Sequence, residues 1–146
     1  MKPMEKTSTP FDPALAGWRQ HTLDGFIQLA GPLWSRCDEG EWKYGLLTEA
    51  KHANPASVIH GGLLVTLMDH ALSAIAWEAA GRLPCVTIQL DTHFLSAVQP
   101  GSFIVARGRI TRRSSTLVFM QGALSVEKDE VVTGNAILKI IKTASR

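Results

Sequence analysis

The chain has 146 residues, which suits one domain of ordinary size and leaves little room for two. Hydrophobic residues make up 45% and charged residues 19%, with a formal net charge of +2. This composition is typical of a globular protein and excludes a strongly basic nucleic-acid-binding surface. Cys37 and Cys85 lie far apart without the spacing of a zinc site, so no metal is expected.

We interpret residues 1–20 as a polar lead-in and residues 21–146 as one domain. The opening MKPMEKTSTPFDPALAG lacks the apolar core of a secretory signal, which favours a cytoplasmic location. Residues 59–80 are apolar but interrupted by charged and histidine side chains. Their continuous apolar runs are shorter than the ~18 residues that a membrane span needs. We therefore expect a core helix and no membrane partner.

Hydrophobic periodicity predicts the elements in chain order. Residues 23–30 indicate a short helix that ends at Gly31-Pro32, and a hairpin follows over residues 33–48. A long helix begins near Gly62. Four strands come after it, at 85–98, 103–111, 117–127 and 131–141. Their connecting turns are short enough to join antiparallel neighbours as a meander. One long helix and about six strands predict an α+β domain, with the helix packed on a curled antiparallel sheet.

The long helix has a narrow polar stripe. At about 100° per residue, the following side chains fall on one face: Gly62, Thr66, Asp69, His70, Ser73 and Trp77. A carboxylate beside so much apolar surface needs water, a donor or a substrate. Asp69 either pairs with His70, or faces solvent, or serves a reaction.

The entrance to this helix carries His60-Gly61-Gly62. Glycines let a ligand approach the backbone closely, and free N–H groups of the first turn favour a negative oxygen. A plain tight turn is the alternative. Together with Asn54 and Asp69, this entrance supplies the parts for attack on an acyl carbonyl.

Asp69 lies eight residues beyond Gly61, or ~12 Å along the helix axis, too far to serve a carbonyl held at its own helix start. A second copy with an antiparallel helix would supply the missing group. The spacing therefore predicts a homodimer with two equivalent sites across its interface.

The order Asn54, His60-Gly61-Gly62, Asp69 resembles the signature of hotdog-fold acyl-CoA thioesterases, in the PaaI-like branch of the 4-hydroxybenzoyl-CoA thioesterase superfamily. The similarity runs from about Gly31 to the C-terminus. It implies a hotdog fold, in dimers that often pair into tetramers. The implied activity is hydrolysis of an aryl- or fatty-acyl-CoA, without metal and with no cofactor besides the coenzyme A of the substrate.

The resemblance also implies residue roles. Asp69 would act as general base on water or as nucleophile, and the Gly61 N–H would polarise the thioester carbonyl. Asn54 and His60 would position the thioester and the water, which Thr87 would hold.

Two positions depart from the family pattern. Ser57 stands where many relatives have glycine in the loop before His-Gly-Gly, which bears on how Asn54 is aimed. The hairpin at Lys128-Asp129-Glu130 lacks a glycine common there.

Contacts to coenzyme A are expected from Gly62 and from the most basic stretch of the chain. This stretch contains Arg107, Arg109, Arg112 and Arg113, followed by Ser114, Ser115 and Thr116. Arginine forks and hydroxyls suit phosphate oxygens, although a solvated strand face is the alternative. Trp77 is the best candidate among the tryptophans for the wall of an acyl pocket.

Two other functions remain open. A hotdog enoyl-CoA hydratase would carry an Asp-x-x-x-x-His pattern at the helix entrance, which this chain lacks. A non-enzymatic acyl-CoA binding or sensing protein would have no need for Asp69.

Overall fold

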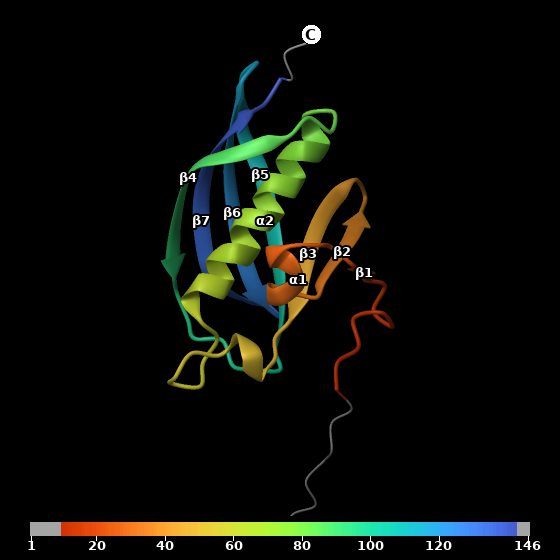
Figure 1. Cartoon of the computed structure of the whole chain (residues 1–146), viewed down its shortest axis with the longest axis vertical. Helices are drawn as coiled ribbons and strands as arrows, with labels where there is room; N and C mark the ends of the chain where they lie inside the picture. Colours follow the sequence, from red (N-terminus) through yellow and green to blue (C-terminus); the bar gives the residue numbers. More distant parts are fainter. Residues whose placement is uncertain (1–9, 143–146) are drawn as a thin grey trace, which may run out of the picture.

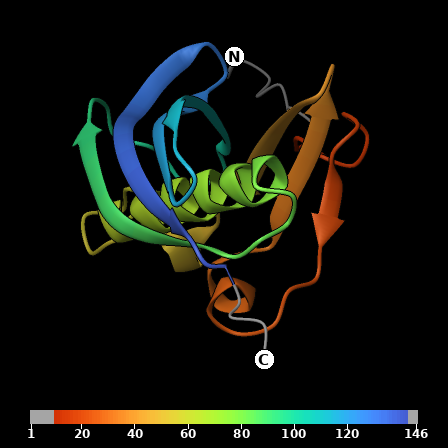
Figure 2. The same cartoon turned by 90° about the horizontal axis from the view of Figure 1, so that it is seen from above.

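The computed structural model describes residues 10–142, which form one antiparallel sheet around a long helix (Figures 1 and 2). The strands are β1 (Arg19–His21), β2 (Leu33–Asp38), β3 (Glu41–Leu47), β4 (Cys85–Phe94), β5 (Phe103–Arg113), β6 (Leu117–Val126) and β7 (Asp129–Ile140). The helices are α1 (Phe26–Ala30), the 3-10 helix η1 (Ala50–His52) and α2 (Gly61–Ala79). Within these residues the sheet has seven strands in the order β1-β2-β3-β5-β6-β7-β4. The predicted α+β architecture is confirmed.

The predicted meander is wrong at one junction. The first two strands after the helix are not neighbours, because β4 pairs with β7 at the sheet edge and β5 pairs with β3 and β6. The segment between β4 and β5 crosses the end of the sheet. Along it Leu95 N–H bonds Val131, Val98 accepts from Ile59, and Ser102 accepts from Thr48. The connection thus leaves β4 at the sheet edge, separated from β5 by β6 and β7.

The sheet wraps around α2, which lies across its concave face (Figure 2). Three glycines in register, Gly108, Gly122 and Gly134, mark the closest approach. A Cβ on Gly108 would lie 2.5 Å from Leu72 Cδ2, and one on Gly122 would lie 2.7 Å from Met68 Sδ. Both helix side chains are buried. The glycines are therefore needed because α2 rests directly on the backbone of β5, β6 and β7.

Strand β4 forms an edge of the sheet. A bulge at Ile88 separates the pairings of Thr87 and Gln89 with β7. Because the bulge changes the side-chain alternation, Thr87 and Leu90 both face α2 although they are three residues apart. Val86 and Ile88 are about half exposed, at 48% and 57%. The edge therefore presents apolar side chains and unpaired backbone groups together.

Helix α2 has 19 residues and begins at Gly61, close to the predicted start. Its buried side chains face the sheet and its polar stripe is only partly covered, as predicted. Within residues 10–142, no helix is long and apolar enough to cross a membrane.

We expect Gly122→Val to lower the free energy of unfolding by about 1–3 kcal/mol, because the new side chain overpacks the contact with Met68 and Leu72. Chemical denaturation measures the change. Ala123→Val is the matched control, since residue 123 points away from α2. An equal effect of both substitutions would contradict the close contact.

Candidate functional site

The entrance to α2 is built around His60. Its Nδ1 accepts the Gly62 N–H at 2.8 Å, which caps the helix. A Cβ on Gly62 would lie 2.9 Å from that nitrogen, so glycine makes room for the cap. The His60 carbonyl accepts from Leu63 and Leu64. In residues 10–142 the Gly61 N–H has no acceptor, which leaves it free for a ligand oxygen.

The free Gly61 N–H lies beside a hollow of about 280 Å³. The hollow is formed by the helix start and by the segment that follows β4. Its lining residues are Ile59, Gly61, Leu64, Phe94, Leu95, Ser96, Ala97 and Val98. Most of these are apolar, so a carbonyl placed here would meet the amide with little competition from other donors.

Asn54 shapes the loop that leads into this entrance. Its Oδ1 accepts the N–H groups of Ala56 at 2.9 Å and Val58 at 3.3 Å. Its side-chain NH₂ group remains able to donate to a ligand. Ser57 adopts the left-handed φ of 64°, the conformation in which glycine is favoured. The departure from the family pattern therefore leaves the tight turn in place and strains one residue.

A buried histidine ties this loop to α1. His52 Nδ1 accepts the Glu49 N–H at 2.9 Å, so Nε2 carries the proton and donates to the Ala30 carbonyl at 2.7 Å. The His52 carbonyl in turn accepts the His60 N–H. The end of α1 and the entrance of α2 are thus held by one residue, His52, through its side chain and its carbonyl.

Asp69 is held by a hydroxyl on β4. Thr87 Oγ1 donates to Asp69 Oδ1 at 2.6 Å, and Ser73 Oγ lies 3.4 Å from Thr87 Oγ1. The single hydroxyl proton of Thr87 points to Asp69, so Ser73 is the donor in the second contact. The structure places Thr87 at Asp69, whereas the resemblance implied that Thr87 holds the water, a role that stays a prediction. It also places Ser73 here, one helical turn beyond Asp69.

Asp69 and Ser73 line a cavity of about 620 Å³ between α1, α2 and β4. Half of its ten lining residues are apolar. The list is Leu23, Asp24, Phe26, Ile27, Val65, Thr66, Asp69, His70, Ser73 and Leu90. The sequence interpretation missed the wall from Leu23 to Ile27, because a five-residue helix far from the motif carries no chemical signal.

His70 does not pair with Asp69. The ion pairs among residues 10–142 do not include this one, although Asp69 is the next residue. Burial lowers the pKa of His70, and the nearby Asp69 carboxylate acts in the opposite direction. The ring packs edge-on against Tyr44, with centroids 6.3 Å apart. Burial also raises the pKa of Tyr44 to about 12. His70 thus lines the cavity, while Tyr44 packs against the ring without lining the cavity itself.

The cavity of Asp69 and the hollow of Gly61 share no lining residue. Eight residues of one helix separate the two groups, or about 12 Å. Each chain therefore presents two half-sites, one with the carboxylate and one with the free amide.

The basic stretch is divided between the two faces of the sheet. Arg107 and Arg109 line a groove on the face away from α2, whereas Arg113 donates to the Ala79 carbonyl at the end of α2. A bulge between Ile110 and Arg112 causes the division.

The two serines after the basic stretch and the predicted acyl-pocket tryptophan lie elsewhere. Ser114 Oγ closes the turn by accepting the N–H groups of Thr116 and Leu117, and Ser115 is exposed in that turn. Trp77 is 37% exposed and packs under Arg82, at 5.1 Å from the guanidinium carbon to the ring centroid. It does not line the Asp69 cavity in the single chain. Their contacts with coenzyme A stay predictions.

Comparison with known proteins places this geometry in a family. Residues 56–133, more than half of the chain, match the model of the thioesterase superfamily. The chain belongs to the thioesterase superfamily.

Three relatives illustrate the similarity. Mouse acyl-coenzyme A thioesterase 13 is 31% identical over 90 residues, which are 61% of this chain and 61% of the mouse protein. The PaaI protein of E. coli superposes with a TM-score of 0.67 at 18% identity, covering 75% of this chain and 80% of that one. A Bacillus halodurans protein solved with CoA superposes with a TM-score of 0.70 at 20% identity, covering 75% and 74%. The hotdog fold is confirmed, and PaaI proteins are among the structures that share it.

We expect Ser57→Gly to raise the free energy of unfolding by roughly 1 kcal/mol, because glycine adopts the left-handed conformation without the steric strain that serine has there. Thermal or chemical denaturation tests this. Ala56→Gly changes the preceding residue, which does not have that conformation, and should not stabilise the chain. A destabilising Ser57→Gly would contradict the strained turn.

Proposed function

We propose that this protein hydrolyses acyl-CoA thioesters. The observation that carries the proposal is the Asp69 carboxylate, held by Thr87 at 2.6 Å in a half-apolar cavity. An apolar wall suits an acyl group, and an anchored carboxylate beside it suits activation of water. The supporting relatives are a named acyl-coenzyme A thioesterase and a structure that contains CoA.

In the proposed reaction, Asp69 takes a proton from a water molecule while the water oxygen attacks the thioester carbon. The carbonyl oxygen gains negative charge, and the Gly61 N–H donates to it. The C–S bond then breaks, the carboxylic acid forms, and the proton passes from Asp69 to the thiolate sulfur. Asn54, through its free NH₂ group, and His60 would position the thioester.

Thr87 restricts how Asp69 can act. Because Thr87 occupies Oδ1, the other oxygen is left to accept the proton of water or to attack the carbonyl itself. Direct attack would form a mixed anhydride that water then hydrolyses. Both routes use the same half-sites.

We infer that the two half-sites meet across a homodimer. The apolar edge of β4 carries Val86 and Ile88, and pairing it with a second β4 would satisfy its backbone groups. In such a pair the Gly61 amide of one protomer faces Asp69 of its partner. A tetramer built from two dimers stays a further prediction.

Gly61 offers a test of the amide alone. Gly61→Pro removes the N–H, and the first helical position tolerates proline. The preceding His60 has φ −58° and ψ 130°, which suits a residue before proline. We expect kcat for acyl-CoA hydrolysis to fall about 10²- to 10³-fold, the usual loss for one oxyanion donor.

Gly61→Ala is the matched control. It keeps the N–H and adds a Cβ that meets Phe94 at an ordinary 3.4 Å. Equal loss in both variants would reject the role of the amide, and unchanged turnover in Asp69→Asn would reject the thioesterase proposal. Retained CoA binding without any turnover in the native protein would favour an acyl-CoA sensor.

Mixed dimers test the shared site. A dimer of one Asp69→Asn chain and one Gly61→Pro chain contains one whole site and one doubly defective site. We expect about half of the native turnover, measured on heterodimers isolated with two affinity tags, whereas each variant homodimer keeps only its own strongly reduced turnover. Absence of recovery in the isolated heterodimer would show that each chain works alone.

A further inference from the structure

The apolar wall of the Asp69 cavity is concentrated at α1. Three of its five apolar lining residues, Leu23, Phe26 and Ile27, belong to α1 and to the segment just before it. Figure 2 shows α1 on the side of α2 away from β5, β6 and β7. An acyl group whose thioester lies at Asp69 buries most apolar surface if it extends toward α1.

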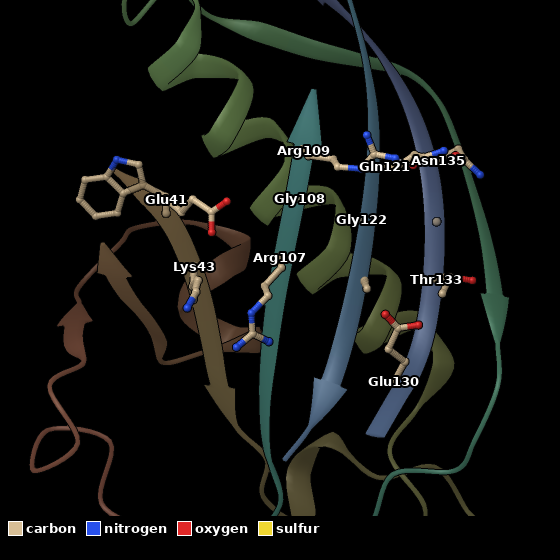
Figure 3. A pocket seen from close by; sticks show the side chains of 13 residues that line it. Glu41, Lys43, Arg107, Gly108, Arg109, Gln121, Gly122, Glu130, Thr133 and Asn135 are labelled. Carbon is tan, nitrogen blue, oxygen red and sulfur yellow. Dashed lines mark hydrogen bonds between the residues drawn. The ribbon is translucent and has the colours of Figure 1, made fainter. Parts of the chain in front are cut away.

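The sheet closes the opposite direction. Met68 and Leu72 fill the space between α2 and the row of glycines. The groove on the far face of the sheet, where Arg107 stands (Figure 3), shares no lining residue with the Asp69 cavity. The hollow of Gly61 shares none either. Neither gives an acyl group further room, which leaves the side of α1.

A second hollow, here called the α1 hollow, lies between β1, α1 and the start of β2. Its volume is about 210 Å³. Leu23 and Ile27 line both this hollow and the Asp69 cavity, so the two side chains form a partition between them. The other lining residues are Gln20, His21, Thr22, Gln28, Gly31, Pro32, Leu33 and Lys51. Small-ligand sites usually have ~300–1,000 Å³, so the α1 hollow suits the end of a ligand that begins elsewhere.

The segment that carries the partition is anchored on both sides. Before it, β1 pairs with β2, and the His21 ring contacts the Ser35 hydroxyl. After it, the Ala30 carbonyl accepts from His52 Nε2 at 2.7 Å. Because both ends are held, the size of the two side chains decides how much room an acyl group has.

We propose that Leu23 and Ile27 set the maximum length of the acyl group. The thioester lies at Asp69, the acyl chain runs along α1, and its far end stops at the partition. Shortening either side chain opens the α1 hollow to a longer chain. The two residues determine specificity and take no part in the reaction. This proposal rests on the proposed function, because the thioester at Asp69 is what places the acyl group in this cavity.

Ile27→Ala tests the partition in the full chain. Alanine has the highest helix propensity, so the substitution keeps α1 and removes the part of the side chain that separates the two volumes. The ratio of kcat/KM for dodecanoyl-CoA to kcat/KM for hexanoyl-CoA should rise about tenfold, the effect of burying roughly two more methylene groups. Leu23→Ala, which lies outside α1, should raise the same ratio.

Leu29→Ala is the matched control. Leu29 belongs to α1, is 75% exposed and lines neither the cavity nor the α1 hollow, so its loss should leave the ratio unchanged. An equal rise in the control would mean that α1 as a whole has loosened, and it would overturn the partition. An unchanged ratio in Ile27→Ala and Leu23→Ala, with turnover present, would overturn the partition and leave the thioesterase proposal standing.

Binding separates this inference from the proposed function. The S-hexyl and S-dodecyl thioethers of CoA cannot be hydrolysed, and calorimetric titration gives the ratio of their dissociation constants. If the native chain has no turnover but Ile27→Ala shifts binding toward the dodecyl compound, the partition stands and the thioesterase proposal fails. No shift in binding in such a chain would overturn the partition as well.

Discussion

The contact of α2 with the glycine row of β5, β6 and β7 is the constraint on which the structure depends. Met68 and Leu72 occupy the space that side chains at Gly108 and Gly122 would fill. This contact fixes the rotation of α2 about its axis. The opposite stripe, with Asp69 and Ser73, must then face α1 and β4. The position of the carboxylate is thus a result of how the helix packs, and no contact of Asp69 itself is needed to set it.

Strand β4 completes one half-site and leaves the other open. Its bulge at Ile88 turns both Thr87 and Leu90 toward α2, so one strand supplies the hydroxyl that holds Asp69 and an apolar residue of the cavity wall. The same strand is an edge with exposed apolar side chains. The carboxylate at mid-helix and the free amide at the helix start belong to different hollows. The proposed second copy at this edge would account for both features at once.

The polar stripe and the start of the long helix were predictable because both depend on local periodicity and on neighbouring residues. The place of β4 was not, since its pairing with β7 is decided by contacts about fifty residues away in the chain. The separation of Arg113 from Arg109 follows from a one-residue bulge, which leaves no mark in the sequence. The left-handed conformation of Ser57 was not predicted for another reason. Glycine usually occupies this conformation, so a serine at the position does not indicate it.

The glycine row also explains why the two faces of the sheet can carry different chemistry. On the concave side, the row is filled by α2 and tolerates no added atoms. On the convex side, each flanking residue projects into solvent, so its identity is not fixed by the packing of the core. Arg107 and Arg109 lie at such positions, where nothing in the fold requires an arginine. Isolated exposed charges contribute little to stability, so the side chains on this face can vary while the row of glycines keeps α2 in place.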